Sequence, residues 1–351
     1  MKGLLLSGGH GTRLRPITYS QQKQLIPVAN KPILFYAIED LIEAGIREIG
    51  IIIGGPNKDQ VIDTVKASNW EAEIKFIYQD EPKGLAHAIL VAEEFLDEDF
   101  VMYLGDNILR EGIVEHAKKF KENNYDASIM LTEVENPQQF GVADIKKDGS
   151  IRLVEKPAVP PSNLALIGVY FFKPIVFESC KSIKPSWRNE LEITDTIQWL
   201  IDNNYKVGWT KIEGWWKDTG KPEDILEANR LVLDDIKMNN EGTIKGRSRI
   251  IGRVTIGKGA KIENSLLKGP SLVGENCLIK NSYVGPYTSI GMDCIIEDTE
   301  IEDSIVMQKS EISGGGRIIE SLIGKEVKIK RKTDLPSGKK VVVGDNSELI
   351  G

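Results

Sequence analysis

Apolar residues up to about Asp235 alternate between short runs and helical spacing. Short apolar runs predict buried strands, and apolar residues that recur every three or four positions predict helices that bury one face. The predicted strands are Lys2–Leu6, Glu48–Ile53, Ile74–Tyr78, Phe100–Leu104, Ser128–Val134 and Leu166–Phe172, and the predicted helices are Ile33–Gly45, Leu85–Phe95 and Glu192–Ile201. This alternation indicates an α/β domain with a mostly parallel sheet, whose ligands bind at the carboxyl ends of the strands.

A different pattern begins at Gly242. Isoleucines recur every six residues at Ile244, Ile250, Ile256 and Ile262, and the register slips around Pro270 before it returns. A six-residue apolar period with turn residues between fits neither an amphipathic helix nor a simple hairpin, and it is typical of hexapeptide β-solenoids. The alternative is a β-rich domain with accidental spacing.

The change of pattern predicts two domains. An α/β domain would cover residues 1–238 and a β-helix domain residues 239–351. Residues 244–330 would form roughly five coils, and the last residues, with the apolar run Val341–Val343, would form a final strand or a cap.

The charge balance narrows the possible partners. The chain has 45 Lys and Arg residues against 52 Asp and Glu residues, a net charge of −7. Nonspecific nucleic-acid binding is therefore not expected, because proteins that coat nucleic acids are normally basic. No apolar run approaches the ~20 residues of a membrane span, and the N-terminal MKGLLLSGG predicts a buried strand rather than a signal peptide. The three cysteines show no metal-ligand spacing and favour a reducing, cytoplasmic setting.

The loop Ser7–Arg13 is the first candidate for chemistry. It follows a predicted strand, and its glycines leave backbone N–H groups able to converge on an anion, with Arg13 adding a positive fork. No Lys-Ser/Thr follows the glycines, so it is not a Walker A loop, and Leu14 stands where a dinucleotide fingerprint has its third glycine. Taken alone, the loop could equally be a plain tight turn.

Three further segments give the loop a context. Gly8–Pro16 has the pattern Gly-Gly-x-Gly-Thr-Arg-Leu-x-Pro, Lys23–Val28 has Lys-x-Leu-x-Pro-Val, and Lys31-Pro32 follows. Together they resemble the signature of the sugar-1-phosphate nucleotidylyltransferases. Supporting segments extend the resemblance over residues 1–230 in the family's order: Gln79, 82–88, 104–107, 140–142, 155–157, 168–171, 190–195 and 216–220. The resemblance is greatest to long members that transfer a thymidylyl group, and it implies a Rossmann-like nucleotidyltransferase domain followed by a left-handed parallel β-helix.

Members of this family join a nucleoside triphosphate to a sugar-1-phosphate and release pyrophosphate. The two substrates together carry about six negative charges, so catalysis is mainly charge neutralisation and in-line positioning. The resemblance implies that the triphosphate is held by Arg13 and the backbone of Gly8, Gly9, Gly11 and Thr12. Lys23 would face the α-phosphate, where charge grows in the transition state.

A magnesium site is implied by two carboxylates. Asp106 follows a predicted strand and Asp218 lies in a Trp-x-Asp-Thr-Gly turn. Either aspartate alone could be a turn or cap residue. As a pair they suit Mg²⁺, which takes one or two carboxylates and completes its shell with phosphate oxygens and water.

The resemblance also assigns the base and sugar sites. The base would contact the glycine loop, Gln79, Pro82, Gly84 and Leu85. Lys156 and Arg188 would hold the sugar phosphate, and the sugar would contact Gly141, Glu155, Leu166 and Gly168. The Gln79 amide suits the imide edge that thymine and uracil share. A preference for dTTP with measurable use of UTP is therefore expected, since one methyl group is worth about 1–3 kcal/mol. His87 is expected to be structural.

Three alternatives remain. A UTP-dependent enzyme acting on glucose-1-phosphate would share these motifs. A bifunctional enzyme with acetyltransferase activity is disfavoured, because residues 242–351 lack the histidine that usually serves as general base. A non-catalytic scaffold subunit should have lost the charged residues that are present here. We expect the solenoid to serve assembly, giving a homo-oligomer.

Overall fold

The computed structural model describes residues 1–9, 11–147 and 149–331, which form two compact units. The first, which we call the α/β unit, holds the described residues among 1–9, 22–24 and 34–218. The second, the β-helix unit, holds residues 11–21, 25–33 and 219–331. The predicted terminal strand or cap lies outside the described residues, and the domain boundary at 238/239 stays a prediction.

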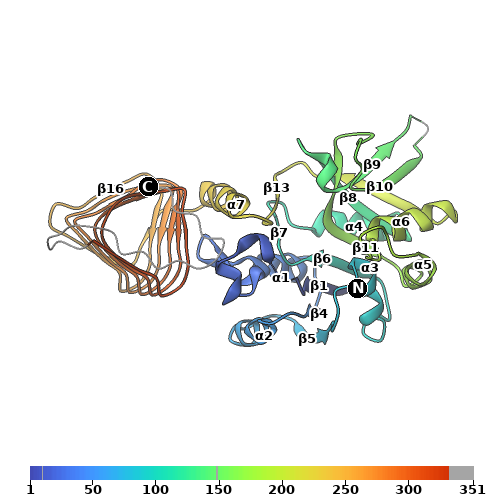
Figure 1. The fold of residues 1–351 in the computed structure, drawn as a ribbon, viewed down its shortest axis with the longest axis horizontal. Coiled ribbons are helices and arrows are strands. Elements are labelled where there is room, and N and C mark those ends of the chain that lie inside the picture. The colour runs from blue at the N-terminus through green and yellow to red at the C-terminus, as the bar shows by residue number, and fades with distance from the viewer. Residues whose placement is uncertain (10, 148, 332–351) are drawn as a thin grey trace. The chain divides into compact units, whose positions relative to one another are not determined.

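Nine of the described strands form one mixed sheet in the α/β unit (Figure 1). They are β1 (Lys2–Ser7), β4 (Glu48–Ile53), β5 (Glu73–Tyr78), β6 (Phe100–Leu104), β8 (Ala127–Glu133), β9 (Gly141–Ile145), β10 (Ile151–Glu155), β11 (Leu164–Phe172) and β12 (Val207–Lys211). Their order is β10-β9-β11-β6-β1-β4-β5, with β8 paired to β11 and β12. The predicted Rossmann-like α/β fold is confirmed.

The sheet is parallel from β6 through β1 and β4 to β5, and antiparallel around β11. The antiparallel part arises because β9 and β10 form a hairpin and β11 runs back between β6 and β8. Such strands need no helical crossover. The positions of the predicted helices therefore could not show that these strands run antiparallel.

Helices pack against this sheet. They are α1 (Ile33–Glu43), α2 (Lys58–Lys66), α3 (Leu85–Val91), α4 (Val114–Glu122), α5 (Val176–Ser182) and α6 (Ile193–Asp202). The prediction for α3 was too long at its end, because Ala92 leaves helical geometry with φ −95° and ψ 6°. α3, α5 and α6 contact one another, and Leu4 and Leu6 of β1 belong to the core beneath them.

Stacked parallel strands make up most of the β-helix unit, drawn in orange to red in Figure 1. They are β14 (Asn239–Asn240), β15 (Thr243–Lys245), β16 (Arg249–Ile251), β17 (Val254–Ile256), β18 (Lys261–Glu263), β19 (Leu266–Lys268), β20 (Ser271–Val273), β21 (Leu278–Lys280), β22 (Tyr283–Val284), β23 (Thr288–Ile290), β24 (Ile295–Glu302), β25 (Ile305–Val306), β26 (Glu311–Ile319), β27 (Leu322–Ile323) and β28 (Lys328–Lys330). The predicted parallel β-helix is confirmed.

The coil length explains why the sequence period slips. One row of isoleucines pairs from coil to coil as Ile244, Ile262, Ile279, Ile296, Ile312 and Ile329. The steps along this row are 18, 17, 17, 16 and 17 residues. Most coils are therefore shorter than three full hexads, so a strict six-residue period cannot persist.

Besides residues 11–21, two segments outside the coils pack with them in the β-helix unit. They are α7 (Pro222–Asp234) and the hairpin of β2 (Pro27–Val28) and β3 (Lys31–Pro32). Asn229 of α7 is fully buried, and its Nδ2 donates to the carbonyl of Tyr287 at 2.9 Å. Its Oδ1 accepts from Ala29 N at 2.9 Å and from Ser289 Oγ at 2.7 Å. One side chain thus links helix, hairpin and coils.

Replacing Asn229 by Ala should destabilise the β-helix unit by about 2–4 kcal/mol, because three buried hydrogen bonds are lost and their partners stay buried. Chemical denaturation followed by circular dichroism measures the shift in midpoint. Asn239→Ala is the matched control, since Asn239 is exposed and should change stability by less than about 0.5 kcal/mol. Equal midpoints for the two variants would contradict the linking role of Asn229.

Among the described residues, no helix combines the length and apolarity that a membrane crossing requires. The predicted homo-oligomer stays a prediction.

Candidate active site

The carboxyl ends of β1 and β6 lie side by side. Leu6 pairs with Leu104, and Gly105 N donates to the carbonyl of Leu6 at 2.9 Å. Gly8, which follows β1, and Asp106, which follows β6, are therefore at the same edge of the sheet. This is the edge at which ligands bind in α/β sheets.

The glycine loop is supported by a residue that the sequence analysis missed. Gln22 is buried, and its Nε2 donates to the carbonyls of Ser7 at 3.1 Å and Gly9 at 3.3 Å. A Cβ built on Gly9 would meet nothing within 4 Å, so the loop borders open space there. The Gln22 contacts fix the loop's carbonyls from one side.

The rest of the loop falls in the β-helix unit. Thr12–Leu14 forms a single 3-10 turn, and Thr18 Oγ1 donates to the carbonyl of Gly11 at 2.7 Å. Arg13 is exposed on this turn. Its predicted action together with Lys23 stays a prediction.

Lys23 and Asp106 form an ion pair at the carboxyl edge. Lys23 Nζ lies 2.5 Å from Asp106 Oδ2, and the Lys23 side chain is only 8% exposed. Burial alone would raise the pKa of the Asp106 carboxyl, but the Lys23 ammonium and the hydrogen bond from Asn107 outweigh burial and lower this pKa below its usual value. Asp106 is therefore a carboxylate at neutral pH, as a metal ligand must be.

Asn107 positions Asp106, and the sequence analysis did not single it out. Its Nδ2 donates to Asp106 Oδ1 at 2.9 Å. Its Oδ1 accepts from Gly168 N at 3.2 Å and from Trp216 Nε1 at 2.6 Å. Asn107 is 2% exposed, so the contacts hold the side chain from three directions. The only sequence feature that could have pointed to Asn107 was its place directly after Asp106.

Strand pairing places Asp218 opposite the residue that follows Asp106. β7 (Asn107–Leu109) and β13 (Trp216–Asp218) are antiparallel, and Asp218 is the partner of Asn107. Residues that face each other in such a pair have Cβ atoms about 5 Å apart. The two predicted metal ligands are thus one residue out of register across a two-stranded sheet. Within the described part of the chain, no group of three or more His, Cys, Asp or Glu residues is placed to hold a metal.

Glu155 is the centre of the predicted sugar site. It ends β10 and pairs with Gly141, which begins β9. Thr194 Oγ1 donates to Glu155 Oε2 at 2.6 Å. A Cβ on Gly141 would lie 2.7 Å from Thr194 Oγ1 and 3.2 Å from Glu155 Oε2, so only glycine leaves room for this contact. Thr194 therefore fixes the Glu155 carboxylate, a role the sequence analysis missed.

Two cations lie against the same carboxylate. Lys156 Nζ is 3.6 Å and Arg188 Nη1 is 3.8 Å from Glu155 Oε1. Arg188 also contacts Glu190 at 3.0 Å and Glu192 at 3.4 Å. Lys156 has φ +39°, an uncommon conformation for a residue with a side chain. The structure thus brings the two cations predicted for the phosphate together with Glu155, which was predicted for the sugar.

Leu166 and Gly168 lie on β11. Leu166 Cδ1 is 3.7 Å from the Cβ position of Gly141, which puts it beside Glu155. A Cβ on Gly168 would lie 2.8 Å from Asn107 Oδ1. β11 therefore connects the predicted sugar wall to the residue that positions Asp106.

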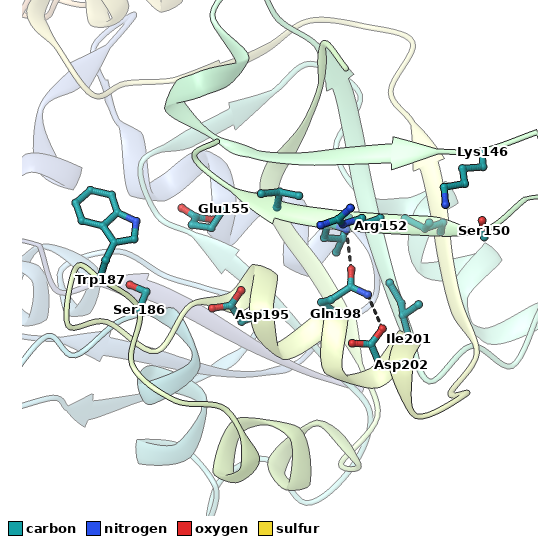
Figure 2. Close-up of a pocket in the computed structure, with 13 residues that line it drawn as sticks. Lys146, Ser150, Arg152, Glu155, Ser186, Trp187, Asp195, Gln198, Ile201 and Asp202 are labelled. Atoms are coloured by element: carbon teal, nitrogen blue, oxygen red, sulfur yellow. Dashed lines mark hydrogen bonds between the residues drawn. The ribbon is translucent and has the colours of Figure 1, made fainter. Parts of the chain in front are cut away.

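A pocket of about 740 Å³ runs along β10 and α6. Figure 2 shows Glu155 and Trp187 toward one end and Lys146 and Ser150 toward the other. Among the described residues that line it, Glu155 is the one assigned to the predicted site. The pocket therefore borders the predicted sugar site, and neither Lys156 nor Arg188 lines it.

The predicted base site is hydrogen-bonded to Leu191, in the segment that carries Arg188. A Cβ on Gly84 would lie 2.4 Å from the carbonyl oxygen of Leu191, and Leu191 N donates to the carbonyl of Lys83 at 2.8 Å. Gly84, with φ +104°, is thus required for this close approach. Pro82 and Leu85 flank the same contact, with Pro82 exposed.

Gln79 lies near the glycine loop. Its Oε1 is 3.5 Å from the Cβ position of Gly8. Its Nε2 is 2.9 Å from His87 Nδ1. Gln79 is 7% exposed, so its side chain is almost fully enclosed.

Comparison with known proteins places this chain in a family. A family model described as nucleotidyl transferase matches residues 2–235. The Haloferax volcanii protein named low-salt glycan biosynthesis nucleotidyltransferase Agl11 is 50% identical, over 99% of both chains. The Streptomyces griseus protein named glucose-1-phosphate thymidylyltransferase is 46% identical, over 99% of this chain and 98% of its own.

A crystal structure of a candidate glucose-1-phosphate thymidylyltransferase from Bacillus anthracis, in complex with sucrose, superposes with a TM-score of 0.63 at 34% identity. It covers 68% of this chain and 98% of its own. The sequence match, the α/β fold and the charged residues at the carboxyl edge of the sheet all point to the same family. The chain is therefore an enzyme of the nucleotidyl transferase family.

Proposed function

We propose that the protein transfers a thymidylyl group from dTTP to glucose-1-phosphate and releases pyrophosphate, with Mg²⁺ as cofactor. The Lys23–Asp106 pair at the carboxyl edge, with Asp218 on the neighbouring strand, carries the proposal. The Streptomyces griseus relative that bears the name of this activity supports it, because the similarity extends over nearly the whole of both chains.

The donor set suits magnesium. Asp106 and Asp218 offer carboxylate oxygens, the ligands that Mg²⁺ prefers, and substrate phosphates would complete the shell. The bound ion would supply charge neutralisation between the phosphates and the carboxylates.

The chain's own residues would neutralise the remaining charge. An oxygen of the sugar phosphate attacks the α-phosphorus, the bond from the α-phosphorus to the bridging oxygen breaks, and pyrophosphate leaves with that oxygen. Lys23 would face the charge that grows at the α-phosphate. The triphosphate would rest on Arg13 and the backbone of Gly8, Gly9, Gly11 and Thr12.

Lys156 and Arg188 would hold the sugar phosphate in line. Both lie within 4 Å of Glu155, so the carboxylate keeps the two cations together. Glu155 would also accept a hydrogen bond from a sugar hydroxyl. The position of the Glu155 carboxylate is fixed by Thr194. Gly141, Leu166 and Gly168 would form the wall of the sugar site.

Pyrophosphate release with glucose-1-phosphate and Mg²⁺ tests the proposal, with dTTP, UTP, CTP, GTP and ATP in separate reactions. We expect dTTP to be fastest and UTP to follow, since the pyrimidine imide edge is common to both. UTP ahead of dTTP would make the protein a uridylyltransferase. Equal rates with all five, or none with any, would overturn the proposal.

A further inference from the structure

His87 contacts the side chain to which the proposed function assigns the base. It lies in α3, and its Nδ1 is 2.9 Å from Gln79 Nε2. The Gln79 backbone is fixed as well, because Gln79 N donates to the carbonyl of Ile53 at 3.0 Å. A Cβ on Gly54 would lie 2.9 Å from the carbonyl oxygen of Gln79. What remains free in Gln79 is the direction of its amide.

That direction decides which pyrimidine fits. A glutamine amide offers an oxygen that accepts and a nitrogen that donates two hydrogens. Thymine and uracil present an N–H donor at N3 beside an acceptor oxygen at C4. Cytosine presents an acceptor at N3 beside an amino donor, which is the reverse pattern. One orientation of the amide therefore matches thymine and uracil, and the flipped orientation matches cytosine.

His87 selects between the two orientations. In the structure the Gln79 nitrogen faces Nδ1, so Nδ1 accepts one of its hydrogens and the imidazole is neutral. The oxygen and the second N–H of Gln79 remain for a base. A protonated imidazole would donate from Nδ1, so the Gln79 oxygen would have to face His87 instead of the nitrogen.

The surroundings of His87 favour the neutral ring. Burial lowers the pKa of His87 below its usual value, and Lys83 lowers it further, while Glu81 acts in the opposite direction. Glu81 is itself paired with Lys83 at 2.7 Å. His87 is therefore neutral at neutral pH and becomes charged only as the pH falls below the usual range of histidine.

We propose that His87 is a positioning residue that holds the Gln79 amide in the orientation that binds thymine or uracil and rejects cytosine. The inference rests on the proposed function, which places the base against Gln79. It differs from the sequence-based expectation, which gave His87 only a structural role.

The test is the ratio of kcat/KM for dTTP to kcat/KM for dCTP. At pH 8 we expect His87→Leu to lower this ratio by about 10- to 100-fold, because the amide can then turn to suit either base. His87→Glu supplies an acceptor at the same place and should retain the ratio. His116→Leu, a histidine replacement in α4, is the matched control and should leave the ratio unchanged. An unchanged ratio in His87→Leu would overturn the inference.

The pH dependence of the same ratio tests the wild-type protein without any variant. The ratio should fall as the pH is lowered from 8 to 5, since His87 gains a proton and then donates to Gln79. Effects of pH on the phosphates cancel, because both nucleotides carry the same triphosphate. A ratio that stays constant across the pH at which His87 gains its proton would contradict the positioning role.

Nitrogen-15 NMR of the histidines gives a readout that needs no activity. The chain has 3 His residues, and the His87→Leu spectrum identifies the His87 signals by their loss. We expect an unprotonated Nδ1 and a protonated Nε2 at pH 8. The opposite tautomer would refute the inference even if the variants were inactive.

Gln79→Ala separates this inference from the proposed function. If it leaves the kcat/KM of dTTP unchanged, the base contact assigned to Gln79 is wrong. If it lowers that kcat/KM by 10-fold or more while His87→Leu keeps the dTTP-to-dCTP ratio, only the role of His87 is wrong.

Discussion

Asp106→Asn should lower kcat for pyrophosphate release by about 1,000-fold or more at saturating Mg²⁺. The substitution keeps the shape of the side chain but removes one of the two carboxylates that would bind the ion, which is worth several kcal/mol of transition-state stabilisation. It also removes the ion pair with Lys23 Nζ at 2.5 Å. The Mg²⁺ concentration for half-maximal activity should rise as well, and this titration separates loss of metal from loss of geometry.

Asp99→Asn is the matched control for this variant. Asp99 precedes β6, at the opposite end from Asp106. It should keep wild-type kcat and wild-type Mg²⁺ dependence. Thermal unfolding of both variants must be followed, since breaking a largely buried ion pair can cost about 3–5 kcal/mol. Activity of folded Asp106→Asn within threefold of wild type would exclude Asp106 as a metal ligand.

The fold was predictable where burial leaves a periodic trace in the sequence. The strands β4 and β6 were predicted at their observed bounds, because a strand buried on both faces is a short apolar run with clear ends. The β-helix was predictable from its recurring isoleucines, because many of them are buried inside the coils. The direction of β11 was not, since antiparallel pairing depends on which strand it joins rather than on its own residues.

The membership of the hairpin 25–33 in the β-helix unit also had no sequence signal. Ala29 N donates to Asn229 Oδ1, and Asn30 Nδ2 donates to the carbonyl of Ile290, so the hairpin is bonded to residues 200 and 260 positions away in sequence. A single buried asparagine that joins distant segments produces no periodic pattern in the sequence. Such long-range polar links are visible only in three dimensions.

The sequence singled out residues that are proposed to meet the substrate, and it did not single out the residues that hold them in place. Charged and glycine-rich motifs identified Asp106, Lys23 and Glu155, whose chemistry is recognisable from residue type. The side chains that position them are Asn107 and Thr194, which are ordinary polar residues in sequence. Their importance follows from burial and from contacts at 2.9 Å and 2.6 Å with the two carboxylates.

The segments predicted to meet the base and the sugar phosphate are joined by hydrogen bonds in the α/β unit. The carbonyl of Leu191 accepts a hydrogen bond from Ala86 N at 3.1 Å, and Leu191 N donates to the carbonyl of Lys83. The start of α3 and the residues before it are therefore bonded to the segment that carries Arg188. A shift of either loop would therefore be transmitted to the other. This connection offers a physical reason for close alignment of the two substrates, on which in-line attack depends.

Lys23→Met should lower kcat by about 1,000-fold while the KM for dTTP changes by less than about threefold. A cation that faces charge developing at the α-phosphate stabilises the transition state more than the bound substrate, and loss of one such group costs about 3–4 kcal/mol. Lys118→Met is the matched control, because Lys118 is 62% exposed on α4. A large rise in KM at constant kcat would show instead that Lys23 only binds the triphosphate.

The double variant Asp106→Asn/Lys23→Met tests whether the pair acts as a unit. The two side chains share a contact at 2.5 Å, and Lys23 is one cause of the lowered pKa of Asp106. When two residues act as a unit, removing either one already removes most of their joint contribution to kcat. The double variant should therefore be little slower than the slower single variant. Independent action would instead multiply the two losses to about a million-fold. Single-turnover rates resolve these outcomes, and a multiplied loss would mean that Lys23 and Asp106 serve separate steps of charge neutralisation.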